Sequence, residues 1–130
     1  MFDGDYLNGK QWNGFIKEYC PYSNLIFKGT IRNGERNGYG QEFEDTKVIF
    51  SGQYKNGKRN GKGVEKKANG LLIFDGTYIN DHKKEGKYYI KGILEFEGTF
   101  LFDHKWKGKG YDKDKTMIYE LKNGKGKVKE

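Results

Sequence analysis

The stretch FSGQYKNGKRNGKG, residues 50–63, decides the fold of this 130-residue chain. It combines four glycines and four basic residues with two aromatic residues, Phe50 and Tyr54. Glycine loses more backbone entropy in a strand than any other residue, so a random surface segment should not accumulate it. The same pattern recurs along the chain, which indicates that each glycine has a fixed place in a repeating unit.

Six segments align with one another. They are FDGDYLNG from Phe2, FKGTIRNG from Phe27, FSGQYKNG from Phe50, FDGTYIND from Phe74, FEGTFLFD from Phe96 and MIYELKNG from Met117. The first five share a glycine at intervals of 22 to 25 residues, and the sixth has Tyr119 at that position. A period of this size is typical of stacked supersecondary units, so residues 1–130 are predicted to form one repeat array.

The first arm of each unit has the period of a β-strand. Over residues 48–54, apolar and aromatic residues alternate with Ile49, Ser51 and Gln53, which indicates a half-buried strand. The glycine lies on the aromatic face, between two large side chains. Because it has no Cβ atom, we expect it to be a socket covered by a neighbouring aromatic ring.

Asn-Gly or Asn-Asp dipeptides follow the first arm and lead into a shorter second arm, which is a strong hairpin signal. The segment after the dipeptide varies by one position, and we place Trp12 and Trp106, which occupy the extra position, in the hairpin loops. The predicted fold is all-β: an open array of stacked antiparallel β-hairpins in one elongated, twisted sheet, with units starting near residues 2, 27, 50, 74, 96 and 117.

The unit Phe/Tyr-x-Gly-x-Tyr-x-Asn-Gly, followed by a Gly-x-Gly arm, resembles the MORN repeat from about Phe2 to Lys127. The resemblance implies hairpins stacked into an open groove or rod. It also implies use as a scaffold or tether at membranes or the cytoskeleton, and binding to acidic phospholipids in some members. The chain departs from the family pattern in having Tyr, Ile or Phe where many repeats have Trp, and in lacking the usual Tyr-Pro. The lost glycine of the last unit suggests a terminal cap.

Composition narrows the class of protein. Hydrophobic residues make up 34% of the chain and aromatic residues 16%, which predicts a thin aromatic core. No apolar run reaches the roughly 20 residues of a membrane-spanning helix, and the N-terminus lacks a signal-peptide layout. A single cysteine, Cys20, excludes an internal disulfide framework. We expect a cytoplasmic protein, associated in some settings with membrane or cytoskeleton, and Met1 leading directly into a unit favours a complete chain.

Residues typical of catalysis are sparse. His82 and His104 each follow an aspartate, and two Asp-His pairs on neighbouring hairpins are the one metal-site alternative. We favour a turn variant, because no cysteine pair accompanies them. Cys20 has no histidine nearby in the sequence, and NGKRNGKG lacks the residue order of a phosphate-binding loop. The sequence therefore predicts no enzyme, no catalytic residue, no metal and no cofactor.

The net charge of +7 is concentrated in residues 50–73, which have six basic residues and one acidic residue. If half of these charges faced a flat anionic membrane, they would contribute roughly 2–3 kcal/mol to the free energy of binding. Nucleic acid is less favoured, because the aromatic residues alternate into the packed face and acidic residues are interspersed. The predicted anionic-surface residues are Lys55, Lys58, Arg59, Lys62, Lys66 and Lys67.

The sequence thus predicts a non-enzymatic scaffold that displays an aromatic groove and a basic rim to a protein partner. The alternative function is peripheral attachment to acidic membranes through residues 50–73. Unpaired strands at the ends of an open sheet also favour end-to-end association of copies. The predicted partner-binding residues are Trp12, Tyr54, Tyr78, Phe100 and Trp106.

Overall fold

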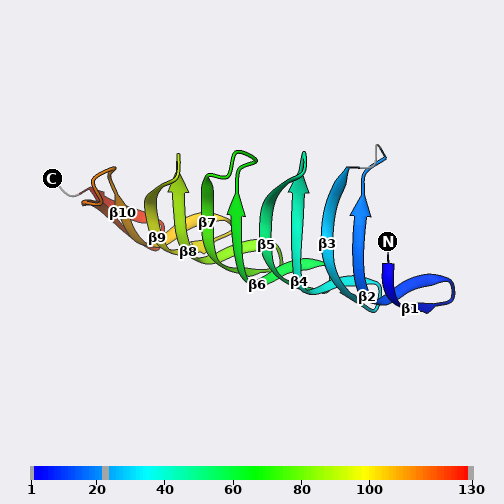
Figure 1. Ribbon diagram of the computed structural model, residues 1–130. Helices are drawn as coiled ribbons and strands as arrows, with labels where there is room; N and C mark the ends of the chain where they lie inside the picture. The colour runs from blue at the N-terminus through cyan, green and yellow to red at the C-terminus, as the bar shows by residue number, and fades with distance from the viewer. Residues whose placement is uncertain (1, 22–23, 129–130) are drawn as a thin grey trace.

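The computed structural model describes residues 2–21 and 24–128, and every regular element in this part of the chain is a strand. Twelve antiparallel strands form one sheet in chain order (Figure 1). The strands are β1 (Phe2–Leu7), β2 (Lys10–Tyr19), β3 (Leu25–Arg32), β4 (Glu35–Glu44), β5 (Lys47–Lys55), β6 (Lys58–Lys66), β7 (Leu72–Ile79), β8 (His82–Ile90), β9 (Ile93–Leu101), β10 (His104–Tyr111), β11 (Met117–Lys122) and β12 (Lys125–Val128).

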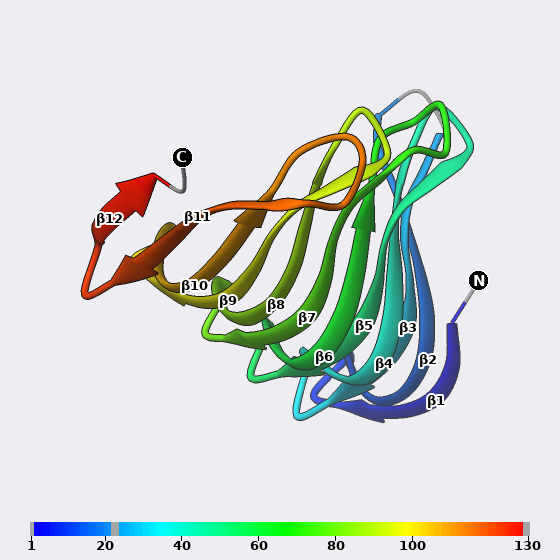
Figure 2. The ribbon, with the colours of Figure 1, turned by 90° about the vertical axis from the view of Figure 1, so that its left-hand side faces the viewer.

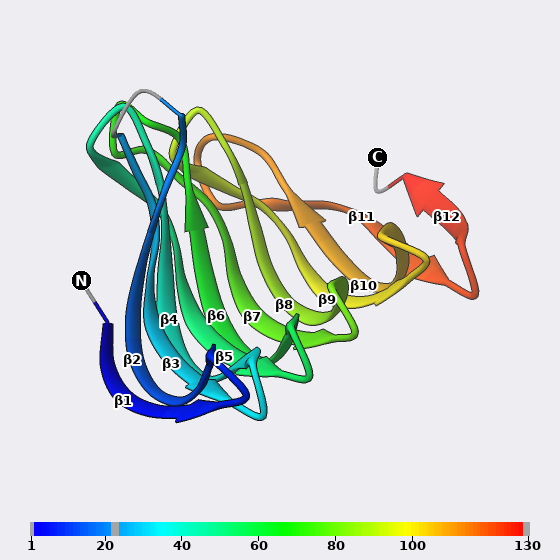
Figure 3. The same ribbon diagram turned by 90° about the vertical axis from the view of Figure 1, so that its right-hand side faces the viewer.

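The predicted all-β, open hairpin array is confirmed. Successive strand pairs form six units, from unit 1 (β1–β2) to unit 6 (β11–β12), and the two ends of the chain lie at opposite ends of the array (Figure 1). Each strand bends along its length, so the sheet is strongly curved (Figures 2 and 3). The six hairpin turns form one margin of the sheet, the turn-side rim. The loops that join one unit to the next form the other margin, the loop-side rim.

The hairpin turns are uniform. Each has two residues between paired strand ends, as in Lys55 opposite Lys58, and both turn residues have positive φ angles, as type I′ turns require. The first turn position has φ between 47° and 53° in every unit and is filled by Asn8, Asn33, Asn56, Asn80, Phe102 and Asn123. Phe102 is thus the one exception to asparagine at this position.

The units differ in length within the second strand of each hairpin, which we call the return strand. The predicted placement of Trp12 and Trp106 in the hairpin loops is therefore wrong. Trp12 lies in β2 and Trp106 in β10, where it is an extra residue between the paired Lys105 and Lys107. In unit 3, by contrast, three residues of β6 stand opposite Gln53. A type I′ turn holds two residues, so additional residues form a β-bulge in the strand that follows.

Eight glycines stand directly opposite one another across the sheet, from β3 to β10. They are Gly29, Gly40, Gly52, Gly63, Gly76, Gly86, Gly98 and Gly108. The Phe50 ring covers two of them: a Cβ atom would lie 2.7 Å from its Cζ at Gly52 and 2.6 Å at Gly63. The predicted glycine socket is therefore confirmed, and we call this row the glycine column.

The core is one layer of aromatic rings on the face of the sheet that carries the glycine column. Phe27, Phe50, Phe74 and Phe96 are fully buried. Each phenylalanine from Phe27 to Phe74 packs edge-to-face against the second aromatic residue of the next unit, as Phe50 does with Tyr78 at 5.3 Å between centroids. This confirms the expected thin aromatic core, and the contacts between units make the array continuous.

The last unit differs from the sequence alignment. Tyr119 stands opposite Gly110, which on its other side pairs with Phe96. Tyr119 therefore occupies the phenylalanine position and not the glycine position, which Leu121 fills opposite Gly108. The Tyr119 ring stacks on Phe96 with an interplanar angle of 15°.

Within the described residues, no helix is long and apolar enough to cross a membrane.

Candidate interaction surfaces

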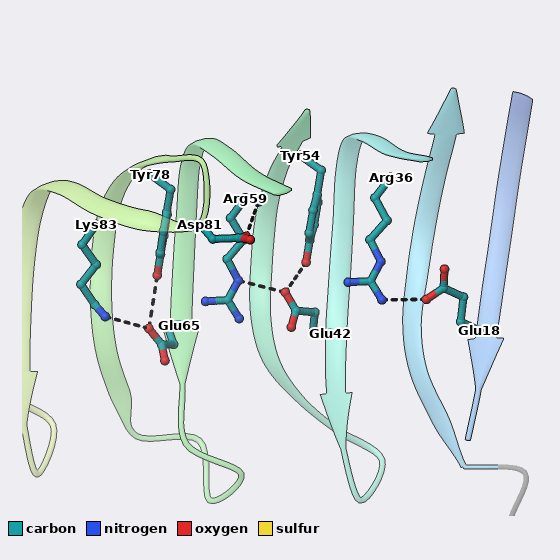
Figure 4. A network of polar contacts seen from close by, with 9 residues as sticks. All are labelled: Glu18, Arg36, Glu42, Tyr54, Arg59, Glu65, Tyr78, Asp81 and Lys83. Atoms are coloured by element: carbon teal, nitrogen blue, oxygen red, sulfur yellow. Dashed lines mark hydrogen bonds and ion pairs between the residues drawn. The ribbon is translucent and has the colours of Figure 1, made fainter. Parts of the chain in front are cut away.

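A ladder of ion pairs runs over the aromatic layer (Figure 4). In units 2 to 5, one cation follows the hairpin turn and lies over the phenylalanine of its own unit, with the Arg59 guanidinium 3.9 Å from the Phe50 centroid. The cations of units 2, 3 and 4 each also contact a carboxylate of the preceding unit. These contacts are Arg36 to Glu18 at 2.6 Å, Arg59 to Glu42 at 2.9 Å and Lys83 to Glu65 at 3.6 Å. The ladder therefore ties units 2, 3 and 4 each to the unit before it.

Tyrosine hydroxyls complete the ladder. Tyr54 donates to Glu42 at 2.5 Å, and Tyr78 donates to Glu65 at 3.3 Å (Figure 4). Burial raises the pKa of Glu42, but hydrogen bonds from Arg59 and Tyr54 outweigh it and hold this pKa below its ordinary 4.5. Burial and the adjacent carboxylates raise the pKa of Tyr54 and Tyr78. Glu42 is thus ionised and the tyrosines neutral near pH 7, as a structural network requires.

The ladder persists where the return strand lacks its glutamate. In unit 4 that position is Tyr88, which pairs with Phe74 as Glu65 does with Phe50. Glu95, just before Phe96, supplies the carboxylate in place of the missing glutamate. Lys105 contacts Glu95 at 2.5 Å, and the Tyr119 hydroxyl donates a hydrogen bond to it at 2.6 Å. The sequence analysis missed this network. Its signal was a basic residue at one offset after the turns of units 2 to 5, and a glutamate where other units have isoleucine before the phenylalanine.

The predicted aromatic groove needs correction. Tyr54, Tyr78 and Phe100 are 4%, 2% and 9% exposed, so their rings belong to the core and offer almost no surface to a partner. Trp12 is half-buried, and Trp106 is 36% exposed. Each tryptophan carbonyl accepts a hydrogen bond from the turn glycine of the next unit. Trp106 alone among the five predicted residues keeps a substantial exposed surface.

The six predicted anionic-surface residues do not form one patch. Lys55 and Lys58 are exposed on the turn-side rim, whereas Arg59 belongs to the ladder. Lys62 is exposed on the opposite face of the sheet from the rings. Lys66 and Lys67 lie on the loop-side rim, at the far end of β6, up to about 26 Å from Lys58 along the strand at 3.3 Å per residue. No single flat surface contacts all six.

The turn-side rim changes character along the array. In units 2 and 3 it carries the exposed cations Arg32, Lys55 and Lys58. In units 4 and 5 it carries exposed apolar residues: Ile79 is 46% exposed, Leu101 43% and Phe102 76%. The rim therefore has an excess of basic residues over units 2 and 3, where Glu35 is also exposed, and carries apolar residues beside the exposed Asp81 and Asp103 over units 4 and 5.

Asp103 joins the turns of units 4 and 5. Its carboxylate accepts a hydrogen bond from the Lys83 amide at 2.8 Å and lies 2.7 Å from His82 Nδ1. Slight burial raises the pKa of Asp103, but these two hydrogen bonds outweigh it and lower the pKa. Asp81 likewise accepts from the Arg59 amide. The Asp-His dipeptides therefore act as turn elements, and the described residues contain no cluster of three or more metal-ligand side chains.

The loop-side rim carries a second exposed apolar group. Leu71, Ile90 and Ile93 are 39%, 47% and 45% exposed. A Cβ atom at Gly92 would lie 3.1 Å from Leu71 Cδ2, so the two loops are in contact. Residues 66–72 and 90–93 contain three exposed lysines, Lys66, Lys67 and Lys91, and no acidic residue. The two loops therefore form one basic, apolar surface.

A sequence model of the MORN repeat matches residues 27–45 and 50–71. Both matches are consistent with a MORN-repeat protein. The matched segments are units 2 and 3, the two units with an arginine in the ladder. MORN repeats are non-enzymatic modules that generally serve protein or membrane interaction. A search of curated proteins gave no match.

Proposed function

We propose that this MORN-repeat protein is a scaffold that binds a protein partner along the turn-side rim, with Phe102 as the anchor. The observation that carries the proposal is the place of Phe102 in its turn. Its φ of 50° is left-handed, and asparagine fills this position in the other five turns of the turn-side rim. In the turns of the loop-side rim, Asp45 and Lys91 have a similar φ. This conformation costs a residue such as phenylalanine about 1–2 kcal/mol. The ring recovers little of this by packing, since Phe102 is 76% exposed. Strain without a folding benefit is typical of functional positions.

The surroundings of Phe102 suit a protein surface. Leu101 and Ile79 add exposed aliphatic area on the two turns that Asp103 joins. Aromatic anchors in such patches supply much of the binding energy of an interface. The cations of units 2 and 3 lie along the same rim and would steer an acidic partner. The partner is therefore a protein segment with an apolar residue to cover Phe102 and acidic residues beside it.

The substitution Phe102→Asn separates binding from folding. It restores the residue of the other turns, so we expect the free energy of unfolding to rise by about 1 kcal/mol. Peptides selected from a random display library on the wild-type protein should bind this variant at least about tenfold more weakly, a loss of about 1.4 kcal/mol. Unfolding in urea and titration calorimetry measure the two effects. Leu71→Asn, on the loop-side rim, is the matched control, and peptides that bind Phe102→Asn as tightly as wild type would refute the anchor.

Attachment to an acidic membrane is the second candidate, favoured by the loop-side rim. Its three lysines contribute about 3 kcal/mol at an anionic surface. Inserting the three half-exposed aliphatic side chains adds roughly 3 kcal/mol. The sum of these two free energies is an upper bound, and it corresponds to an enrichment of the protein at the membrane by about four powers of ten. This surface keeps Lys66 and Lys67 of the predicted basic patch and adds the apolar contact that charge alone lacks.

Co-sedimentation with acidic and neutral vesicles across a salt series tests this candidate. We expect salt-sensitive binding to acidic vesicles, lost in Lys66→Ser with Lys67→Ser and in Leu71→Ser with Ile93→Ser. Lys55→Ser with Lys58→Ser removes the same charge from the turn-side rim and should leave binding unchanged. Equal losses in both lysine variants, or no binding at low salt, would exclude the loop-side rim as a membrane contact.

A further inference from the structure

The two edges of the sheet carry opposite charge. Among the described residues, no strand pairs with the outer edge of β1 or of β12. Asp3 and Asp5 are exposed on β1, which has no basic residue. The sequence of β12 is KGKV, with two lysines and no acidic residue, and Lys125 is exposed. The edges lie at opposite ends of the array (Figures 1 and 3).

Strand direction allows these edges to pair. Every neighbouring pair in the sheet is antiparallel, and the sheet has twelve strands, so β1 and β12 run in opposite directions. A second copy in the same orientation, placed beyond β12, would therefore present its β1 antiparallel to that strand. The junction would continue the alternation of the sheet and satisfy the free backbone groups of both edges.

The registers near both edges place the charges together. In unit 6, Gly126 stands opposite Leu121, which occupies the glycine column opposite Gly108. In unit 1, Gly4 stands opposite Gly14, which pairs with Ile31, so these two glycines lie two residues out of the glycine column but on the same face. Setting Gly126 of one copy opposite Gly4 of the next puts Lys125 opposite Asp5, and position 127 opposite Asp3. Opposite charges at such cross-strand positions each contribute roughly 0.2–1 kcal/mol.

We propose that copies of this chain associate head to tail, with β12 of one copy pairing with β1 of the next. Pairing of like edges is disfavoured, because β1 against β1 opposes aspartates and β12 against β12 opposes lysines. The contact joins two different surfaces, so each added copy leaves one free edge of each kind. Such an interface generates an open-ended filament and not a closed dimer.

The aromatic face of unit 1 supports this assignment. Tyr6 packs edge-to-face on Phe2 at 5.0 Å, much as Tyr54 packs on Phe50 at 5.7 Å. Tyr54 is only 4% exposed, with Phe27 of the preceding unit 5.3 Å away. Within residues 2–21 and 24–128 no unit precedes that of Tyr6, and Tyr6 is 60% exposed. A copy docked on β1 would supply the missing neighbour and bury this ring.

Charge reversal at either edge tests the proposal. We expect the 130-residue wild-type chain at low salt to grow in mass with concentration by sedimentation velocity, and to form filaments by electron microscopy. Asp3→Lys with Asp5→Lys makes both edges basic, and Lys125→Glu with Lys127→Glu makes both acidic. Each variant should remain monomeric, whereas an equal mixture of the two should assemble into alternating filaments. Glu85→Lys with Asp114→Lys changes the net charge by as much as Asp3→Lys with Asp5→Lys does, but away from the edges, and should assemble as wild type does.

The outcomes are decisive once circular dichroism shows each variant folded. A wild-type chain that stays monomeric at its highest soluble concentration overturns the proposal. A mass that stops at a dimer overturns the head-to-tail geometry, since a closed dimer needs like edges. Failure of the two variants to assemble together overturns the proposed charge register. None of these results depends on Phe102, so the inference and the proposed partner binding succeed or fail separately.

Discussion

We expect Gly52→Ala to lower the free energy of unfolding by about 3 kcal/mol or more. Gly52 has an ordinary backbone conformation, so the cost is steric. A Cβ atom there would lie 2.6 Å from the Lys62 carbonyl oxygen and 2.7 Å from the Gly63 Cα. Both atoms belong to the opposite strand and cannot rotate away. The sheet must separate at its bend, which also removes Phe50 from its socket.

Gly70→Ala is the control for this effect. Gly70 has φ of 91°, which strains any other residue, but no atom lies within 4 Å of its Cβ position. We expect a loss of about 1 kcal/mol from backbone strain alone. Urea denaturation followed by circular dichroism measures both variants. Similar losses for the two would mean that close approach of the strands does not govern the glycine column.

The fold could be predicted from the sequence because its signals are local and repeated. Alternation at period 2 and an Asn-Gly turn specify a hairpin within about ten residues. The aromatic face between Phe50 and Tyr54 also predicted the glycine socket, which Gly52 and Gly63 form. The position of Tyr119 was wrong, because the first arm of unit 6 is shorter and equal spacing from the turn misaligns it. Register between units depends on bulges, and spacing alone does not reveal them.

The candidate surfaces were less predictable than the fold. Alternation shows which side chains share a face, but not whether other residues cover that face. The curvature of the sheet brings Tyr54 and Tyr78 against phenylalanines, and the guanidinium groups of Arg36 and Arg59 lie over these two tyrosines. The same packing removes Arg59 from the basic patch. The exposed groups that remain, at Phe102 and Leu71, interrupt the repeat pattern and so were not recognised.

Arg59→Met should produce the second large effect, a loss of about 2 kcal/mol in the free energy of unfolding. Arg59 stacks 3.9 Å from the Phe50 centroid and binds Glu42 at 2.9 Å. Methionine keeps the apolar contact but leaves Glu42 half-buried without its ion pair. A fully buried unpaired charge costs about 3–5 kcal/mol, and partial exposure reduces this. Lys62→Met, which removes an exposed charge from the same strand, should cost less than about 0.5 kcal/mol.

A double-mutant cycle isolates the ion pair. If the cost of Arg59→Met comes from unpaired Glu42, then Glu42→Gln should relieve part of it. We expect a coupling energy of about 1 kcal/mol or more between the two positions. A coupling near zero, or a Lys62→Met variant as unstable as Arg59→Met, would mean that Arg59 acts through packing alone.

The pH dependence of the same variant gives an independent test. The pKa of Glu42 is lowered below 4.5 in the folded protein, so the unfolded chain binds more protons at this site at acidic pH. The stability that Glu42 contributes is therefore present above its unfolded pKa and is lost as the pH falls through the lower, folded pKa. Removing the Arg59 hydrogen bond should raise the folded pKa of Glu42, since the opposing effect of burial remains. The difference in unfolding free energy between wild type and Arg59→Met should thus shrink below about pH 4.5. A difference that stays constant with pH would show that Glu42 is not the group that Arg59 holds ionised.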